Sequence, residues 1–340
     1  MRQIKVTENT SKIDIAIDEL NSIVEKSLHA IGVPETDIAT VKDILMYAEL
    51  RGNNQGLVKI VGRNVVPSPD SQPIEITKRM PCAAHIKGNG NVGMVVVKQA
   101  MEEACDLANT YGMGIVGTSH TSTSTGAIGY YAEHIANENL IGIIMAGSPK
   151  AVAISGGIDP VLGTNPIAIG VPSKNGPVVL DMATAAMAYF GLIQADRRNE
   201  SIPDDVAYDQ DGTATSNPAA ALKGAIKAFS GHKGSGLALI VEILTGPLLG
   251  ATIYGDEDVG KNNGNLVIAI NPNTMGGLGE FLNRVDTLLG RLKTGRLATD
   301  NQQIFLPGER GNAEAQSKLD KNLISLDRDL LEQLKEIAQA

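Results

Sequence analysis

The sequence predicts an α/β protein in which helical N- and C-terminal segments enclose a mixed sheet. Apolar residues recur at helical spacing near both ends of the chain, whereas short runs of β-branched or aliphatic residues, separated by glycine-rich turns, occupy its middle. The chain has 340 residues, 43% of them hydrophobic, which is enough to bury a large core. We therefore expect two or three lobes around a central α/β domain.

The N-terminal helix is expected over residues 13–28, because five apolar side chains share one helical face there: Ile17, Leu20, Ile23, Val24 and Leu28. Gly32 and Pro34 should end this helix, and a second helix is expected over residues 37–50. The tail from Ser325 onward has the same helical spacing, at Leu326, Leu330, Leu331, Leu334 and Ile337. The chain should thus open and close with helices.

The strands of the central sheet are expected in six β-branched or aliphatic runs: 93–97, 114–117, 140–145, 165–171, 177–180 and 266–270. The segment GNGNVG at residues 88–93 has the glycine spacing of a dinucleotide-binding fingerprint. That fingerprint requires a helix starting at the glycines and an acidic residue about 20 positions later, at the end of the next strand. Here a helix is expected only from about Lys98, and the next strand ends in Gly117 and Thr118. We interpret the segment as a glycine-rich turn.

The composition favours small-molecule chemistry in the cytoplasm. A net charge of −9 argues against a nucleic-acid binder, which would carry clustered lysine and arginine. The two cysteines, Cys82 and Cys105, have neither metal-ligand spacing nor the density of a disulfide scaffold, so we expect a reducing compartment and no metal site. No apolar stretch of a secretory signal opens the sequence. The most membrane-like run, residues 236–255, contains Glu242 and Pro247, which favours a buried helix followed by a break over a membrane span.

Five short segments carry a family resemblance. They are GTSHTSTSTGAIGYYAEHIA, LGTNP, LDMAT, GHKGSGL and LPGER, at residues 117–136, 162–166, 180–184, 231–237 and 306–310. In this order they resemble the type 2 malate/L-lactate dehydrogenase family, whose relatives include ureidoglycolate and sulfolactate dehydrogenases, diketogulonate reductase and cyclic ketimine carboxylate reductases. The resemblance runs from the N-terminal helices to LPGER. It implies a non-Rossmann fold that binds NAD or NADP, a small carboxylate substrate, and a homodimer with active sites near the subunit interface.

The resemblance also divides the chain into three parts. Residues 1–80 would form an N-terminal helical segment on the substrate side, and residues 81–300 a central α/β domain that binds the cofactor. Residues 301–340 would return to pack with the N-terminal helices. By the same resemblance, six residues line the cofactor: Ser148, Asp181, Met182, Ala183, Lys233 and Glu309.

The chemistry of these residues leaves alternatives open. Lys233 lies among Gly231, Gly234 and Gly236, so that the backbone can approach a ligand while the ammonium meets a phosphate or carboxylate, or it is a solvated surface lysine. Asp181 could cap a helix or accept a ribose hydroxyl. Likewise, the side chains of Thr164 and Asn165 could bind a ligand or only hold the turn before Pro166.

The sequence departs from the family at its expected proton donors. Relatives carry a Ser-His-Gly segment after the second helix and an arginine one turn later, but here Gln55 takes the place of the histidine and Lys59 that of the arginine. Glutamine can orient a substrate but does not donate a proton near neutral pH, whereas Lys59 can pair with a carboxylate as a point charge. A second family histidine aligns with Ser124, and His120 lies four positions earlier.

His120 is the titratable candidate in this segment, since no other side chain in residues 118–125 has a pKa near neutrality. It follows an expected strand end, where ligand-binding residues collect, but it could equally be bonded to the neighbouring hydroxyls.

Three functions stay open. The first is hydride transfer between nicotinamide and C2 of a small 2-hydroxy or 2-oxo acid, with His120 or a relayed water exchanging the proton. The second is reduction of a cyclic ketimine carboxylate, whose protonated nitrogen needs no strong acid. The third is a catalytically altered homologue that binds the cofactor without turnover.

Overall fold

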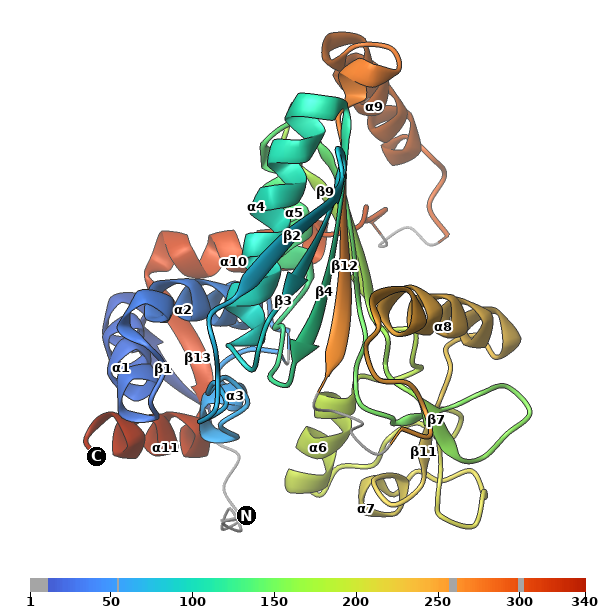
Figure 1. Ribbon diagram of the computed structural model, residues 1–340. Coiled ribbons are helices and arrows are strands. Elements are labelled where there is room, and N and C mark those ends of the chain that lie inside the picture. The colour runs from blue at the N-terminus through green and yellow to red at the C-terminus, as the bar shows by residue number, and fades with distance from the viewer. Residues whose placement is uncertain (1–11, 54, 257–261, 299–302) are drawn as a thin grey trace.

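The fold was examined in a computed structural model that describes residues 12–53, 55–256, 262–298 and 303–340. Its centre is a seven-stranded sheet in the order β2-β3-β4-β12-β5-β8-β9, which we call the large sheet (Figure 1). The strands are β2 (Glu75–Met80), β3 (Ala83–Lys87), β4 (Met113–Thr121), β5 (Ile141–Ala146), β8 (Ile167–Val171), β9 (Val178–Met182) and β12 (Asn263–Ile270). Only β3 and β4 pair in parallel within it, so the sheet is mixed, as predicted.

Helices cover both faces of the large sheet. On one face lie α4 (Gly93–Tyr111), which is the crossover between the parallel strands β3 and β4, and α5 (Gly129–Asn137). On the other face lie α8 (His232–Thr245) and η1 (Pro247–Leu249) (Figure 1). The helix α5 approaches β8 closely because Gly170 has no side chain: a Cβ atom there would lie 2.0 Å from the carbonyl oxygen of Ala132.

The two ends of the chain meet beside the large sheet in what we call the N-terminal unit. It contains β1 (Lys12–Ala16), α1 (Ile17–Ala30), α2 (Glu35–Leu50), α3 (Val58–Val61), α10 (Glu309–Lys321), β13 (Leu323–Asp327) and α11 (Arg328–Ala338). The strands β1 and β13 pair antiparallel, and the buried Ser27 hydroxyl of α1 donates a hydrogen bond of 2.9 Å to the carbonyl of Leu334 in α11. Apolar residues of this unit and of the large sheet form one continuous core.

A smaller four-stranded sheet builds a second unit with a core of its own, which we call the small-sheet unit. Its elements are β6 (Val152–Ala153), β7 (Pro160–Leu162), α6 (Tyr189–Arg197), β10 (Ala207–Tyr208), α7 (Pro218–Ala221) and β11 (Ala225–Lys227). Its core is a separate cluster that includes Val152, Leu192 and Ile226. In Figure 1 this unit lies beneath α8, on the opposite side of the large sheet from the N-terminal unit.

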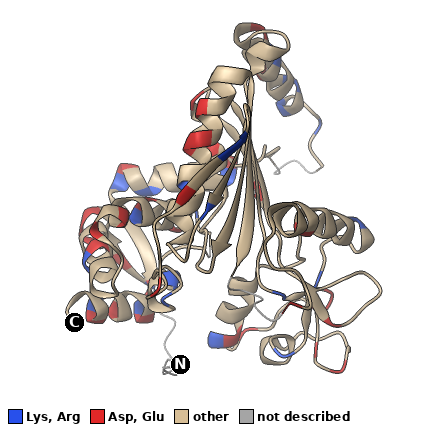
Figure 2. Cartoon of the chain, in the orientation of Figure 1, with Lys and Arg blue, Asp and Glu red and all other residues tan. Residues whose placement is uncertain are grey.

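Two further elements complete the described chain. The short η2 (Pro272–Thr274) leads into α9 (Leu278–Lys293), which stands away from the body and buries none of its residues (Figure 1). Figure 2 shows that charged residues are concentrated on the helices, above all those of the N-terminal unit, while the strands of the large sheet other than β2 carry few. Within the described residues, no helix combines the length and the apolar character that crossing a membrane requires.

Three boundaries differ from the sequence prediction. Residues 13–16 belong to β1 rather than to a helix, and residues 325–327 belong to β13, because these two distant segments pair with each other. The predicted strand at 93–97 was wrong, since these residues begin α4 and place Met94 and Val97 on its buried side. The other five predicted strands are confirmed, with ends shifted by a few residues.

The corrected start of α4 changes the setting of the glycine segment 88–93. It does lie between a strand, β3, and a helix, α4. The following strand β4 nevertheless has no acidic residue at its end, which the dinucleotide fingerprint requires, and the surrounding sheet is mostly antiparallel. The segment thus acts as the turn that was predicted, in a fold that differs from the Rossmann fold.

Candidate functional site

A cavity of about 730 Å³ lies where the large sheet, the N-terminal unit and the small-sheet unit meet. The N-terminal unit contributes part of residues 51–64, and the large sheet contributes the loop 122–126 and the ends of β5 and β9. The start of α6 closes it from the small-sheet unit. The volume falls in the range of small-molecule and cofactor sites, roughly 300–1,000 Å³.

One wall brings together three positions that the sequence singled out. Gln55, Lys59 and Ser124 all line the cavity, although 65 or more residues separate Ser124 from the other two. The backbone of Asn64 connects Lys59 to Ser124. Its amide donates to the carbonyl of Lys59 at 2.9 Å, and its carbonyl accepts from the amide of Ser124 at 2.9 Å. Main-chain bonds therefore hold Lys59 and Ser124 in this wall.

The loop 122–126 is fixed by its own hydroxyl groups. The Thr123 hydroxyl accepts a bond of 2.6 Å from the amide of Gly93, and so satisfies a free donor at the start of α4. The Ser124 hydroxyl accepts from the amide of Gly126 at 3.1 Å, and the buried Tyr131 hydroxyl donates to the carbonyl of Thr125 at 2.8 Å. The run of hydroxyl residues thus shapes the cavity wall.

Lys59 is the unusual cation of this wall. Its side chain is only 2% exposed, and its ammonium lies 4.0 Å from the centre of the Phe190 ring, at the start of α6. It makes no ion pair with any of the described residues. Burial away from water disfavours the charged form and lowers the pKa of Lys59 to about 7. Phe190 is a member of the site that the sequence did not point to, because only the fold brings it opposite Lys59.

Asp181, at the end of β9, both supports the fold and faces the cavity. Its Oδ2 accepts a bond of 3.0 Å from the amide of Gly129, the first residue of α5, so it caps this helix from a strand 52 residues away in sequence. Its carboxyl group is open to solvent within the cavity, yet protein surrounds it, and this enclosure raises the pKa of Asp181 to about 6. Met182 and Ala183 continue the same lining.

The floor of the cavity is made by the LGTNP segment and Ser148. The hydroxyls of Ser148 and Thr164 lie 3.1 Å apart and both line the cavity. Asn165 instead is fully buried and donates to the carbonyl of Ala238, at 3.1 Å, and to the carboxylate of Glu242, at 2.6 Å, both on α8. Of the two predicted ligand contacts, Thr164 is thus available to a ligand and Asn165 anchors α8 to the floor.

Three predicted site residues lie outside the lining of this cavity. His120 is exposed at the end of β4, where its Nδ1 lies 2.9 Å from the Ser119 hydroxyl and its amide donates to Asn262. Partial burial and the charge of Lys87 lower the pKa of His120. Lys233 is exposed at the start of α8. Glu309, at the start of α10, pairs with Lys293 and accepts from the amide of Leu306 at 2.8 Å.

Comparison with known proteins identifies the family. The family model described as malate/L-lactate dehydrogenase matches residues 15–335. The chain belongs to the malate/L-lactate dehydrogenase family. Malate/(S)-sulfolactate dehydrogenase of Methanothermus fervidus is 38% identical to it, with 95% of this chain and 97% of that protein covered. Ureidoglycolate dehydrogenase (NAD(+)) of Escherichia coli O157:H7 is 32% identical over 87% of each chain.

A reductase and a solved dehydrogenase structure are also similar to this chain. Delta(1)-pyrroline-2-carboxylate reductase 1 of Burkholderia ambifaria is 29% identical, over 90% of this chain and 92% of that protein. The crystal structure of a dehydrogenase from Sinorhizobium meliloti superimposes with a TM-score of 0.89 and 29% identity, over 98% of this chain and all of that one. Together with the mixed sheet, this likeness confirms the predicted α/β fold with helical ends.

The residues of the cavity fit the nicotinamide end of a dinucleotide. Ser148 and Thr164 offer hydroxyl donors, and the solvent-accessible carboxylate of Asp181 offers an acceptor of the kind that a ribose hydroxyl requires. Lys59 and Gln55 line the same cavity, and the Lys59 ammonium offers a charge to a small anion. This family member therefore has the donor set for a nicotinamide nucleotide and a carboxylate side by side.

Arg51 is a second lining residue that the sequence analysis did not assign to the site. Its guanidinium lies 3.1 Å from both carboxylate oxygens of Glu133 on α5, 3.1 Å from the Asn312 side chain on α10, and over the Tyr47 ring at 3.6 Å. These contacts tie three helices together behind the cavity. The charge of Arg51 is thus already neutralised, which leaves Lys59 as the buried cation that can meet a substrate.

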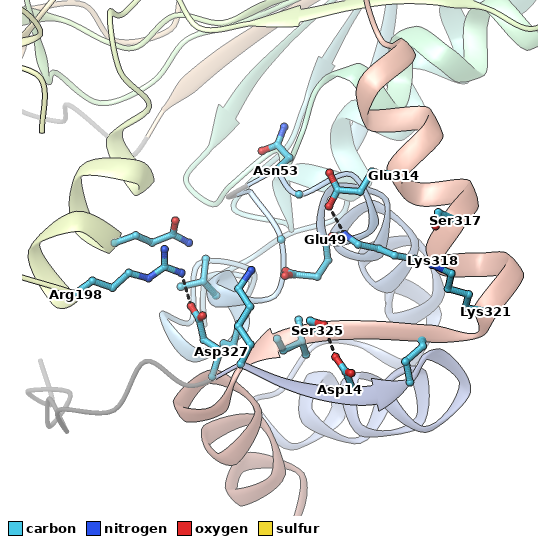
Figure 3. Close-up of a pocket in the computed structure, with 18 residues that line it drawn as sticks. Asp14, Glu49, Asn53, Arg198, Glu314, Ser317, Lys318, Lys321, Ser325 and Asp327 are labelled. Carbon is cyan, nitrogen blue, oxygen red and sulfur yellow. Dashed lines mark hydrogen bonds and ion pairs between the residues drawn. The ribbon is translucent and has the colours of Figure 1, made fainter. Parts of the chain in front are cut away.

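A second cavity, of about 580 Å³, lies against α10 and β13 (Figure 3). It shares Gly52 and Asn53 with the first cavity, and its charges are largely paired, as between Arg198 and Asp327 at 2.7 Å. Glu49 faces it and accepts a bond of 2.9 Å from the amide of Leu57, while burial raises the pKa of Glu49. This carboxylate therefore holds the turn before α3 from behind.

Proposed function

We propose that this family member is an NAD(P)-dependent oxidoreductase of small 2-hydroxy and 2-oxo acids, such as malate-, lactate- or ureidoglycolate-like substrates. The observation that carries the proposal is the cavity itself. It gathers Gln55, Lys59 and Ser124 on one wall and Ser148 with residues 181–183 on the other. A bound nicotinamide would supply or accept the hydride at C2 of the substrate.

In this proposal one set of lining residues binds the substrate and another set binds the cofactor. Lys59 pairs with the substrate carboxylate, and its low exposure, 2%, makes that pairing strong because little water competes. The amide of Gln55 orients the oxygen on C2, and Ser124 offers a hydroxyl beside it. Ser148 and Asp181, with Met182 and Ala183, hold the nicotinamide ribose.

The remaining cofactor residues fit a homodimer. Lys233 and Glu309 do not line the cavity of the single chain, and the family resemblance implies active sites near a subunit interface. The helix α8 that carries Lys233 also exposes large apolar side chains, namely Leu239, Ile240 and Ile243. Our proposal therefore includes a cytoplasmic homodimer in which assembly brings Lys233 and Glu309 to the cofactor.

A cyclic ketimine carboxylate is the second candidate substrate. Among the described residues, no histidine lines the cavity, and both family histidine positions carry side chains that do not titrate near neutrality, Gln55 and Ser124. A protonated imine brings its own proton and would need only the carboxylate anchor, Lys59. The relative named as a pyrroline-carboxylate reductase supports this alternative.

A substrate panel tests both proposals. The purified protein is assayed by nicotinamide absorbance with NADH and with NADPH, against malate-, lactate- and ureidoglycolate-like 2-oxo acids and against five- and six-membered cyclic imine carboxylates. Turnover of the oxo acids supports the dehydrogenase, and turnover of imines alone replaces it with the reductase. Cofactor binding without turnover of any compound would refute both and leave a catalytically altered homologue.

A further inference from the structure

We propose that Lys59 is the group that exchanges the proton with the reacting substrate atom, in the role that relatives give to histidine. The inference rests on the proposed function and adds an acid–base role to the pairing with the carboxylate. It concerns one atom, the Nζ of Lys59, a buried residue that lines the cavity together with Gln55 and Ser124.

The position of Lys59 separates it from ordinary lysines. Its ammonium lies against the face of Phe190, which favours the charged form, while burial favours the neutral form. Both forms are therefore accessible near neutral pH, and the pKa of about 7 agrees with this balance. A group whose pKa lies near the working pH is the most effective general acid and base.

The surroundings of Lys59 leave its proton free to move. Among the described residues, the other charged side chains that line the cavity are Arg51, which Glu133 neutralises, Lys150, which is exposed, and Asp181. The loop 122–126 carries only hydroxyl groups and glycine. The neighbouring helices α6 and α11 carry Asp196, Arg197, Arg328, Asp329, Glu332, Lys335 and Glu336, and Lys335 among them pairs with Glu19 of α1.

In the proposed reaction, one ammonium group must contact both the carbonyl oxygen and a carboxylate oxygen of the substrate. In a 2-oxo acid, the carbonyl oxygen and one carboxylate oxygen can lie on the same side, so the three N–H groups of Lys59 can reach both. When the hydride forms the new C–H bond at C2, the π electrons of the C=O bond move to oxygen, which takes a proton from Nζ. The amine is left neutral and regains a proton from water. In the oxidative direction the neutral amine accepts the hydroxyl proton.

Other residues of the cavity are poorer donors. Gln55 and Ser124 do not titrate near neutrality, and the arginine of the relatives could not give up its proton, since its pKa exceeds 12. His120 lies outside the lining. Asp181 is the one rival, with a pKa of about 6, but its Oδ2 is bonded to Gly129 at the start of α5, on the wall assigned to the cofactor.

The first test needs no substrate. The lysines of the wild-type protein are converted to ¹³C-dimethyl-lysine, and their signals are titrated by NMR, with Lys59→Arg identifying the signal of Lys59. We expect this signal to titrate near pH 7, well below the usual lysine value of about 10.4. A value above 9 for Lys59 would overturn the proposal.

The second test separates proton exchange from carboxylate binding. Lys59→Arg keeps the positive charge and introduces the residue that relatives carry, so it should fold and keep the Michaelis constant within about threefold, but lose about a hundredfold or more of kcat. The limb of the pH profile near neutrality should also disappear. Lys59→Ala should lose both substrate affinity and kcat, with part of the kcat restored by added ethylamine.

Matched variants decide the outcome. Lys150→Arg makes the same change at an exposed lysine of the same cavity, and it should keep kcat and the pH profile. If Lys59→Arg keeps both as well, or if the neutral limb survives there and disappears in Asp181→Asn, the role of Lys59 is overturned while the proposed function stands. If the wild-type protein turns over no oxo acid or imine, the proposed function and the inference fail together.

Discussion

Replacing Asp181 by asparagine should stabilise the protein at neutral pH and weaken its binding of the nicotinamide nucleotide. The native pKa of Asp181 is about 6, against a usual value of 3.8, so the folded state holds the proton more tightly than the unfolded state. The stability that this provides is complete below about pH 4 and is lost as the pH rises through 6. At pH 7 the difference between 6 and 3.8 corresponds to at most about 3 kcal/mol, which we reduce to about 1 kcal/mol because water reaches the carboxyl group in the cavity.

The asparagine keeps the oxygen that accepts from Gly129, so the cap on α5 remains. We expect the thermal midpoint of Asp181→Asn, followed by circular dichroism, to exceed that of the wild type by about 2 °C at pH 7.5 and by less than about 1 °C at pH 4.5. Asp181→Ala is the control: it also removes the charge, but loses the cap. Nucleotide affinity, from NADH fluorescence, should fall in both variants. A midpoint for Asp181→Asn that is lower at pH 7.5 would refute the reasoning.

Three other changes test the surrounding assignments. His120→Asn should keep kcat within about twofold and leave the pH profile intact, because His120 lies outside the cavity lining; a hundredfold loss would restore it as the acid. Lys233→Ala should weaken nucleotide binding by about 1.5–3 kcal/mol in a fluorescence titration, and unchanged affinity would remove Lys233 from the cofactor site. Arg51→Met should lower the thermal midpoint, because it leaves the carboxylate of Glu133, only 18% exposed, without its partner; an unchanged midpoint would show that the pair contributes little.

The sequence predicted the fold wherever local pattern and tertiary pairing agree. The spacing of apolar residues in α1 and the β-branched runs of β5, β8 and β12 needed no knowledge of distant partners. Prediction failed at β1 and β13, where Ile13 and Leu326 face each other across more than 300 residues of sequence. It failed again at the start of α4, where packing against the large sheet outweighs the β preference of the valines at 95–97.

The candidate site was likewise predictable where residues could be matched one by one, and unpredictable where the fold decides. Position-by-position resemblance to the family predicted that Gln55, Lys59 and Ser124 belong together, and they do line one cavity. The burial of Lys59 and its contact with Phe190 depend on how the small-sheet unit lies against the N-terminal unit, which no local pattern reveals. The placement of His120 also depends on the fold, because its backbone has a left-handed conformation, with φ of 56°, at the end of β4.

The backbone relay through Asn64 has a consequence for how such a site can evolve. Main-chain atoms hold the wall at Lys59 and Ser124, and side chains take no part in those two bonds. A mutation at Lys59 can therefore exchange a guanidinium for an amine without breaking these bonds, whereas a change at Ser124 also removes the hydroxyl that accepts from Gly126. A lineage can thus lose one proton donor and recruit another in successive single steps, with a folded protein at every stage.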